Sequence, residues 1–363
     1  MPVSHQGLKV AGHDSFSIAG SVIAPGNAGD VSIPMSELAI GLPATLALRI
    51  FHGAEKGPTI FISAAIHGDE IVGTAIILRL LQVLDPTQLR GTIIFAPAVN
   101  FYGFLQHSRY LPDRRDLNRS FPGNVKGSLA GQLAHCFMTE VIDRCSLGID
   151  IHSAAIHRYN LPQIRIAQDI PELLDLALVF GAPVVIESPL REGSMRALAK
   201  ERGVDMLLME TGEALRFDRV SIEAGVIGVL RVLAKIGMID ASPEWPEAPD
   251  PVRTNSSMWV RAPRGGVSQR LLQSGDVVEK GDLLATVGGL FGEDPIDVES
   301  PIKGIIIGHA TLPVVNQGDA LFHIARTSDL EHASEQVETM TDAIDVGEAP
   351  FAPSPMLDED EVI

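Results

Sequence analysis

Cysteine is scarce in this chain, which has only Cys136 and Cys145 among its 363 residues. Two cysteines cannot build a disulfide framework for a protein of this size, so the sequence predicts a reducing compartment. The opening residues, MPVSHQGLKVAGHD, lack the apolar core of a secretory signal peptide. No run approaches the roughly 18 consecutive apolar residues that a membrane-spanning helix needs. Together these features predict a soluble, cytoplasmic protein.

Basic residues are also few relative to acidic ones. The chain has 28 Lys and Arg against 46 Asp and Glu, which gives a formal charge of −18 at pH 7. The long-range field of such a chain repels phosphate, so neither nucleic acid nor an anionic membrane is an expected partner. A local basic pocket could still bind a small acid. Hydrophobic residues make up 45% of the chain, which is enough for a sizeable core.

Three zones of different composition and an acidic tail follow one another. Residues 1–246 alternate β-branched runs with helical patterns, which predicts an α/β sandwich around a mixed, largely parallel sheet. A proline-rich stretch, 242–251, indicates a linker over 247–258, with a long surface loop as the alternative. Short β-like pieces separated by glycine predict a small all-β module over 259–326. The tail, 327–363, has eleven acids and no Lys or Arg, and predicts a poorly ordered segment.

The first zone contains distinct strand and helix patterns. Apolar runs without polar alternation indicate strands that are buried on both faces. The expected strands are 21–33, 45–51, 59–65, 92–99, 148–151, 164–167, 183–186 and 205–210. The expected helices are 70–84, 129–145, 171–180, 194–202 and 220–236.

A polar turn after the run 59–65 contains His67 and Glu70, in AAIHGDEIVG. Their i, i+3 spacing at a strand-to-helix junction lets both side chains converge on one point, which suits a divalent metal. The alternative is a capped helix start, in which Asp69 or Glu70 accepts hydrogen bonds from the N–H groups of the first turn. His67 would then be a solvated turn residue. The short HxxE motif alone leaves both interpretations open.

A second histidine, His152, follows the apolar run in SLGIDIHSAA. Ligands gather at the carboxyl ends of strands in open α/β sheets, so His152 can join His67 and Glu70. Two imidazoles and one carboxylate are the ligand set of a catalytic zinc that keeps one position open. Asp150 could orient one of these ligands or stay at the strand surface.

Glu210 closes another apolar run, in MLLMETGE, and should reach the same sheet edge. A carboxylate there could act as general base toward a water at the metal. Glu213 is the competitor, but it lies beyond the turn glycine. The sequence therefore favours Glu210 as the base.

The segment HSRYLPDRRDLNRSFPG places four arginines within eleven residues. Arg114 and Arg115 are flanked by acids, which favours a surface loop with local ion pairs. Arg119 differs because it stands beside Asn118 and precedes FPG. An Asn–Arg pair can supply the planar fork that grips a carboxylate.

The chain contains, in this order, the segments HGDE, DLNRSFPG, DIHSA and ETGE. These segments resemble the motifs of the succinylglutamate desuccinylase/aspartoacylase family. The members are zinc-dependent amide hydrolases related to the zinc carboxypeptidases, and the match spans 59–210. The resemblance implies a zinc-carboxypeptidase-like fold. It also implies one Zn²⁺ per chain, bound by His67, Glu70 and His152, with Glu210 as the general base.

The same resemblance implies roles for the basic segment. Asn118 and Arg119 would hold a substrate carboxylate. The family also uses an upstream arginine to polarise the scissile carbonyl, and Arg109, in SRY, corresponds to that residue. Arg114 is the alternative, because Arg109 stands a little farther from Asn118 than in the best-known members.

The module 259–326 resembles the biotinyl/lipoyl-type β-hybrid fold through RAPRGGV, GDVVEKGDLLATV, SPIKGIII and QGDALFHI. Carrier members present a modified lysine at the tip of a hairpin, but the matching stretch GGLFGEDPIDVES contains none, and Lys303 falls after it. We therefore expect a lid or packing module in which His309 and His323 are structural.

These observations predict a zinc-dependent deacylase for the amide bond of a small N-acylated amino acid or amine, with a carboxylate on the substrate. The alternatives are a metal-dependent esterase or carboxypeptidase-like hydrolase, or a catalytically silent binding or scaffold protein. A homo-oligomer is also expected.

Overall fold

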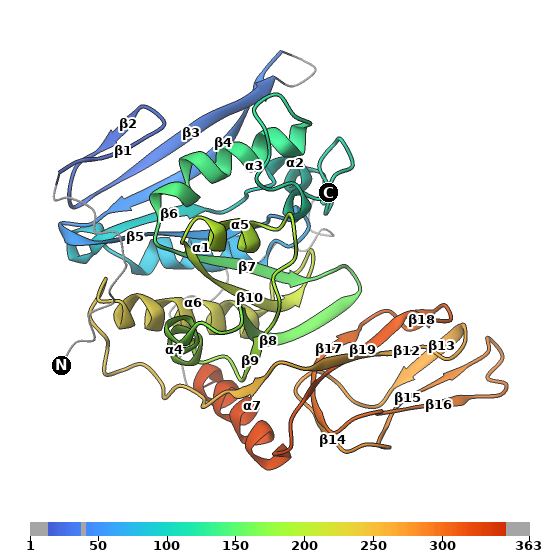
Figure 1. Cartoon of the computed structure of the whole chain (residues 1–363). Coiled ribbons are helices and arrows are strands. Elements are labelled where there is room, and N and C mark those ends of the chain that lie inside the picture. The colour runs from blue at the N-terminus through green and yellow to red at the C-terminus, as the bar shows by residue number, and fades with distance from the viewer. Residues whose placement is uncertain (1–13, 38–40, 346–363) are drawn as a thin grey trace, which may run out of the picture.

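The computed structural model describes residues 14–37 and 41–345, and a large mixed sheet runs through it (Figure 1). A short hairpin, β1 (Phe16–Ile18) and β2 (Ser21–Ile23), lies outside this sheet. The strands of the sheet before residue 255 are β3 (Asn27–Glu37), β4 (Pro43–His52), β5 (Glu55–Ala64), β6 (Arg90–Ala96), β7 (Leu147–Ala154), β8 (Arg158–Ile166), β9 (Val184–Glu187), β10 (Asp205–Glu213) and β11 (Val252–Thr254).

The pairing of these strands is mixed, as the sequence predicts. β6, β5, β7 and β10 lie side by side in parallel, and β8, β9 and β11 form a second parallel set. Antiparallel pairs join β3 to β4, β4 to β6 and β10 to β8. The carboxyl ends of β5, β7 and β10 therefore meet at one edge, which is where ligands collect in sheets of this kind.

Helices cover both faces of the sheet. One hydrophobic core packs α1 (Val72–Val83), α4 (Pro171–Phe180) and α6 (Arg219–Lys235) against one face. A second core packs α3 (Leu129–Glu140) and α5 (Met195–Glu201) against the other. The helix expected over 129–145 is divided, because a 3₁₀ turn, η3 (Ile142–Arg144), follows α3. The remaining short elements are η1 (Pro86–Gln88), α2 (Phe101–Leu105) and η2 (Leu117–Arg119).

Only some of the strands after residue 255 form a separate module. The strands β12 (Ser257–Arg261), β14 (Val277–Val278), β17 (Gly304–Ala310) and β19 (Ala320–Arg326) extend the large sheet. The join is made by β17, which pairs with the first residues of β8, whereas the last residues of β8 pair with β9. A separate four-stranded antiparallel sheet contains β13 (Gly266–Arg270), β15 (Leu283–Gly288), β16 (Ile296–Glu299) and β18 (Val314–Val315).

Two expectations need correction. The stretch expected as a linker, 247–258, contains β11, which pairs in parallel with β9, and the start of β12. The acidic tail contains a helix, α7 (Leu330–Asp345), which buries Ala333, Met340 and Ile344 in the core shared with α6. These apolar residues recur at helical spacing. The prediction of a poorly ordered tail was based on the high acid content and did not consider this spacing. The rest of the tail, 346–363, lies outside the described residues.

Two smaller findings bear on the starting expectations. Cys136 and Cys145 are not joined by a disulfide bond. Within the described ranges, no helix is long and apolar enough to cross a bilayer.

Candidate metal centre and its cavity

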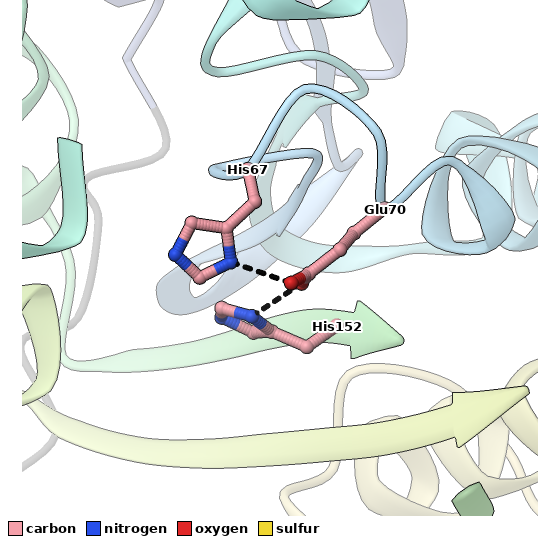
Figure 2. A group of neighbouring side chains, drawn as sticks. All are labelled: His67, Glu70 and His152. Atoms are coloured by element: carbon pink, nitrogen blue, oxygen red, sulfur yellow. Dashed lines mark hydrogen bonds and ion pairs between the residues drawn. The ribbon is translucent and has the colours of Figure 1, made fainter. Parts of the chain in front are cut away.

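The three predicted metal ligands meet at the carboxyl ends of β5 and β7 (Figure 2). His67 and Glu70 lie in the turn between β5 and α1, and His152 lies in β7. The Nδ1 atom of His67 is 2.7 Å from Oε1 of Glu70, and Nδ1 of His152 is 2.8 Å from Oε2. Each side chain is at most 5% exposed, and one ligand atom from each lies within 4.8 Å of the others.

The turn that holds His67 and Glu70 is fixed by its backbone. Ala65 has φ +50°, which turns the chain sharply out of β5. Gly68 then passes so close to Gly103 of α2 that a Cβ atom at residue 68 would lie 2.0 Å from the Gly103 carbonyl carbon. Only glycine tolerates this approach. The helix α1 begins two residues after Glu70, so the capped-helix alternative does not account for both side chains.

Each imidazole is also held from its far side by a carboxylate. Asp150 Oδ2 lies 2.7 Å from Nε2 of His152, and its other oxygen accepts a bond from Ser63 Oγ at 2.7 Å. Asp116 Oδ1 lies 3.3 Å from Nε2 of His67. Carboxylates in these positions favour the Nε2–H tautomer and direct the Nδ1 lone pair toward the metal position, which is the usual arrangement of metal-binding histidines. The donor set therefore fits a single divalent cation.

The ionisable groups of this cluster shift the pKa values of one another toward the charged forms. Burial by itself would lower the pKa of His152, but the carboxylates of Asp150 and Glu70 outweigh it and raise that pKa well above its usual value. Burial would raise the pKa of Glu70, but His67 and His152 hold it far below its usual value. The carboxylate is thus ionised although it is buried, as a metal ligand must be.

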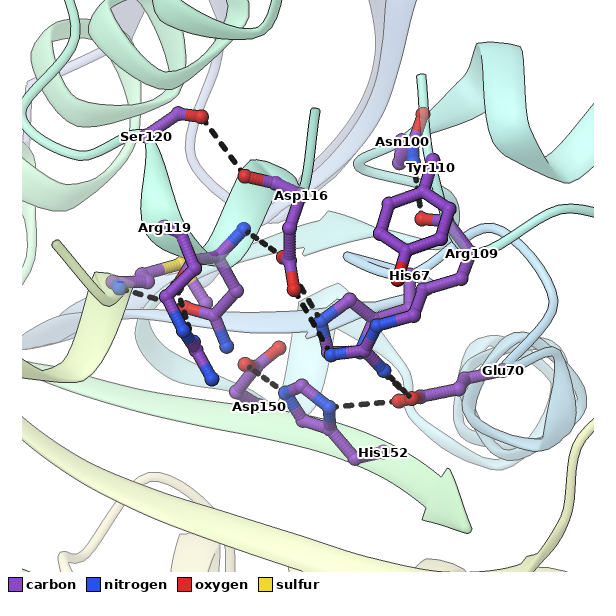
Figure 3. A network of polar contacts seen from close by, with 12 residues as sticks. His67, Glu70, Asn100, Arg109, Tyr110, Asp116, Arg119, Ser120, Asp150 and His152 are labelled. Atoms are coloured by element: carbon purple, nitrogen blue, oxygen red, sulfur yellow. Dashed lines mark hydrogen bonds and ion pairs between the residues drawn. The ribbon is translucent and has the colours of Figure 1, made fainter. Parts of the chain in front are cut away.

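Arg109 lies beside the same carboxylate (Figure 3). Its Nη1 donates to Glu70 Oε1 at 3.1 Å, and its Nη2 donates to Asp116 Oδ2 at 3.0 Å. The guanidinium is therefore oriented at the edge of the metal position. Arg114, the alternative from the sequence, is exposed and does not line the cavity described below.

Sequence reasoning missed Asp116, which it treated as a partner for neighbouring arginines. In the structure Asp116 links His67 to Arg109 and also accepts a bond from the Asn118 N–H at the start of η2. Its place in the DLNR motif, next to two candidate residues, was the signal that could have identified it.

The Asn118–Arg119 pair stands on η2 at the rim of the cavity. Asn118 is buried, and its Oδ1 accepts a bond from the Met195 N–H at 2.9 Å. This contact fixes the amide so that Nδ2 is left as a donor. Arg119 is exposed, and its Nη1 donates to the Asn118 carbonyl.

Glu210 lies on β10, directly beside His152 in the register of the two strands. It is half-buried, and its Oε2 accepts a bond from Asn160 Nδ2 at 2.9 Å. Glu213 is oriented differently, because its Oε1 accepts bonds from the His157 N–H and the Thr311 hydroxyl. Of the two acids, only Glu210 lines the cavity.

A cavity of about 420 Å³ opens over the metal position. Its lining joins His67, Glu70 and His152 to Glu210, and it reaches across β8 to Trp259 on β12 and His323 on β19. Six arginines also line it: Arg109, Arg119, Arg158, Arg165, Arg191 and Arg196. The last four were missed by sequence reasoning, because they are scattered over β8, a loop and α5 without a motif. His323, expected to be structural, belongs to this lining.

Asp150→Asn is expected to weaken metal binding by about 10- to 100-fold, because an amide oxygen accepts a weaker hydrogen bond from His152 Nε2–H than a carboxylate oxygen does. Ser63→Ala, which removes only the other contact of Asp150, is the matched control and should cost less. Competition with a chelator of known affinity measures both. An Asn variant with wild-type affinity would contradict this role for Asp150.

Comparison with known proteins gives consistent matches. The model of the succinylglutamate desuccinylase/aspartoacylase catalytic domain matches residues 56–236. An N-alpha-acetyl-L-2,4-diaminobutyric acid deacetylase from Halomonas elongata is 25% identical over 299 residues, which cover 79% of this chain and 86% of that protein.

Solved structures share the fold. A succinylglutamate desuccinylase/aspartoacylase from Rhodobacter sphaeroides superposes with a TM-score of 0.74 and 25% identity, covering 84% of this chain and 95% of its own. The product-bound ectoine utilization protein EutE (DoeB) from Ruegeria pomeroyi superposes with a TM-score of 0.76 and 23% identity, covering 87% and 100%.

Proposed function

The chain belongs to the succinylglutamate desuccinylase/aspartoacylase family, and from that premise we propose that it is a zinc-dependent deacylase. Its reaction would be hydrolysis of the amide bond in a small N-acylated amino acid or amine. The observation that carries this proposal is the buried set of His67, Glu70 and His152 with Glu210 beside it on one cavity. A catalytically silent scaffold would have no need to keep all four groups together.

The metal ligands would be His67, Glu70 and His152. When bound, Zn²⁺ supplies a Lewis acid that lowers the pKa of a water to about 7 and polarises a carbonyl. Asp150 and Asp116 hold the two imidazoles in the orientation that this requires.

Glu210 would serve as general base and then as general acid. Asn160 holds one of its oxygens, so the other remains to accept a proton from the attacking water. The water oxygen bonds to the acyl carbon, the C–N bond breaks, and Glu210 returns the proton to the leaving nitrogen. Amide cleavage needs that proton because an amide anion is a very poor leaving group.

Arg109 would stabilise the negative charge that develops on the carbonyl oxygen. Its contacts with Glu70 and Asp116 hold the guanidinium in place before substrate arrives, so little reorganisation is needed during the reaction. Asn118 and Arg119 would bind a substrate carboxylate at the cavity rim.

The test is a screen of the purified protein with N-acetyl, N-succinyl and N-formyl amino acids, read by ninhydrin detection of the released amine. Metal analysis of the same sample should give near one zinc per chain. The relative from Halomonas elongata is named for removal of an acetyl group from an amino acid, which makes the acetyl series the first to try. Bound zinc with cleavage of esters or peptides only would favour the esterase or carboxypeptidase-like alternative. A protein without metal or activity would favour the scaffold.

Arg119→Ala is expected to raise KM for carboxylate-bearing substrates by about 10- to 100-fold, since it removes a charge-assisted hydrogen bond from the bound acid. The matched control is Arg115→Ala, because Arg115 is a nearby exposed arginine outside the cavity. Steady-state kinetics on an N-acyl amino acid and its carboxamide measure the effect. Equal kinetics in the two variants would remove Arg119 from substrate binding.

We also propose a cytoplasmic location, which the lack of a disulfide bond between Cys136 and Cys145 supports. Assembly as a homo-oligomer stays a prediction.

A further inference from the structure

A second cavity, of about 280 Å³, lies among α6, α7 and the segment 244–249, which precedes β11. We call it the α6–α7 cavity. It shares no lining residue with the cavity over the metal position. Most of its wall is apolar, and the larger apolar side chains are Val226, Ile227, Leu230, Trp245, Met340 and Ile344. An apolar wall with a few placed polar groups is typical of the pockets in which proteins bind small molecules.

The main polar group of the α6–α7 cavity is the guanidinium of Arg231, on α6. The residue is only 8% exposed, and its Nη2 donates to the Pro246 carbonyl at 2.6 Å. Gly181, at the end of α4, makes room for the guanidinium, because a Cβ atom at residue 181 would lie 2.3 Å from Arg231 Nη1. The fold therefore places a buried cation in the wall of an apolar cavity.

Arg231 has no acidic partner among the described residues. Its hydrogen bond to Pro246 uses one of the five N–H groups of a guanidinium. The Nε and Nη1 atoms make no hydrogen bond to another described residue, and they are not sealed from solvent. Burial lowers the pKa of Arg231, and no neighbouring acid opposes that shift. Because a buried cation without a counterion is costly, an anion bound beside Arg231 would stabilise the folded protein.

The other charged side chains of the lining do not supply that counterion. Glu223 Oε1 lies 3.5 Å from Arg79 Nη2, so the charge of Glu223 is already paired. Arg219 and Glu244 are both exposed, and water screens their charges. The charge that a ligand meets inside the cavity is therefore that of Arg231.

We propose that the α6–α7 cavity binds a small amphiphilic carboxylate, such as a medium-chain fatty acid. The carboxylate group contacts Arg231, and the aliphatic chain or aromatic ring of the ligand lies against the apolar wall. A ligand with a second charged group is excluded, because that group would be buried against apolar side chains without a partner. The site goes beyond the proposed deacylase function, since the two cavities have no residue in common.

The two tryptophans of the chain allow the two cavities to be observed separately. Trp245 lines the α6–α7 cavity, and Trp259 lines the cavity over the metal position. In the full-length Trp259→Phe protein, fluorescence therefore reports on the α6–α7 cavity alone. The probe is 8-bromooctanoate, whose bromine atom quenches tryptophan fluorescence on contact. Titration should give saturable quenching of Trp245, and octanoate without bromine should reverse it by competition.

The role of the charge is tested with the neutral counterpart of the probe. 8-Bromooctanamide should bind about 10- to 100-fold more weakly than 8-bromooctanoate, because it lacks the charge-assisted contact with Arg231. Arg231→Met in the same background should lower the affinity for the carboxylate to that for the amide. Arg231→Lys, which keeps the charge, should retain part of the difference. The matched control is Lys235→Met, an exposed cation on the same helix outside the cavity, which should leave both affinities unchanged.

A second variant, Ala343→Phe, tests the site without removing a buried charge. Ala343 is half-buried on α7 and lines the cavity, so a phenyl ring there should fill the apolar space and abolish the quenching of Trp245. Absence of saturable quenching, equal affinity for the carboxylate and the amide, or binding that survives both Arg231→Met and Ala343→Phe would overturn the proposal.

Two further outcomes would assign the cavity to another occupant and would also overturn the proposal. Quenching that appears only when the protein is diluted to a monomer would identify a second copy of the chain. Quenching that appears only after removal of residues 346–363 would identify that segment. No substrate enters these measurements, so their result does not depend on whether the chain is a deacylase.

Discussion

Glu210→Gln is expected to reduce kcat by about 100- to 10,000-fold while the metal content stays near one ion per chain. Glutamine has almost the same shape as glutamate and can still bond to Asn160, so the cavity should keep its form. It cannot accept a proton from water or return one to the leaving nitrogen. The metal ligands are on β7 and the turn after β5, so the substitution leaves them in place.

The matched control for this substitution is Glu213→Gln. Glu213 is three residues away on the same strand, but it contacts the His157 N–H and Thr311 instead of the cavity. The Glu213→Gln variant should hydrolyse the substrate at the wild-type rate. Measuring kcat and zinc content side by side separates loss of the base from loss of the metal. An active Glu210→Gln enzyme would remove Glu210 from the base role.

His152→Ala is expected to lower the zinc content of the dialysed protein to near zero and to make hydrolysis undetectable. Removing one of three protein ligands leaves a site that a zinc ion binds far more weakly. It also leaves Asp150, 1% exposed, without its imidazole partner and removes one of the two imidazoles that hold Glu70. Uncompensated buried charge is strongly destabilising, so Tm should fall as well.

Elemental analysis, an amine-release assay and a thermal melt measure these three effects. His332→Ala, on α7 and outside the cavity, is the control and should keep metal, activity and Tm. Treatment of the wild type with a chelator should lower Tm in the same direction, because bound metal stabilises the folded state. Full zinc content in dialysed His152→Ala protein would show that the ion binds elsewhere.

Much of the catalytic zone was predictable because its signals are local. Apolar runs gave β5, β6, β7 and β10, and α4 was predicted to the residue. His67, Glu70, His152 and Glu210 each follow such a run, so the rule that parallel strands end at a common edge was enough to expect them together. The structure brings all four to one cavity.

In the acidic tail, the amino-acid composition led to a wrong prediction of disorder. Ala333, Val337, Met340 and Ile344 recur at helical spacing and pack on the core, yet the many acids around them suggested disorder. The helix forms because that apolar stripe is buried against neighbouring helices, which outweighs the polar composition.

The sequence by itself therefore determined most strands and helices of the catalytic zone, the family motifs and the four candidate residues that line the cavity. Only the tertiary structure decided that Asp116 holds His67, that β17 joins the C-terminal strands to β8, and that Arg165 and His323 line one wall of the cavity. The physical reason is that strand and helix patterns are set by neighbouring residues. Contacts between side chains 49 or more positions apart depend instead on how distant strands and turns are brought together, and a local pattern does not specify that.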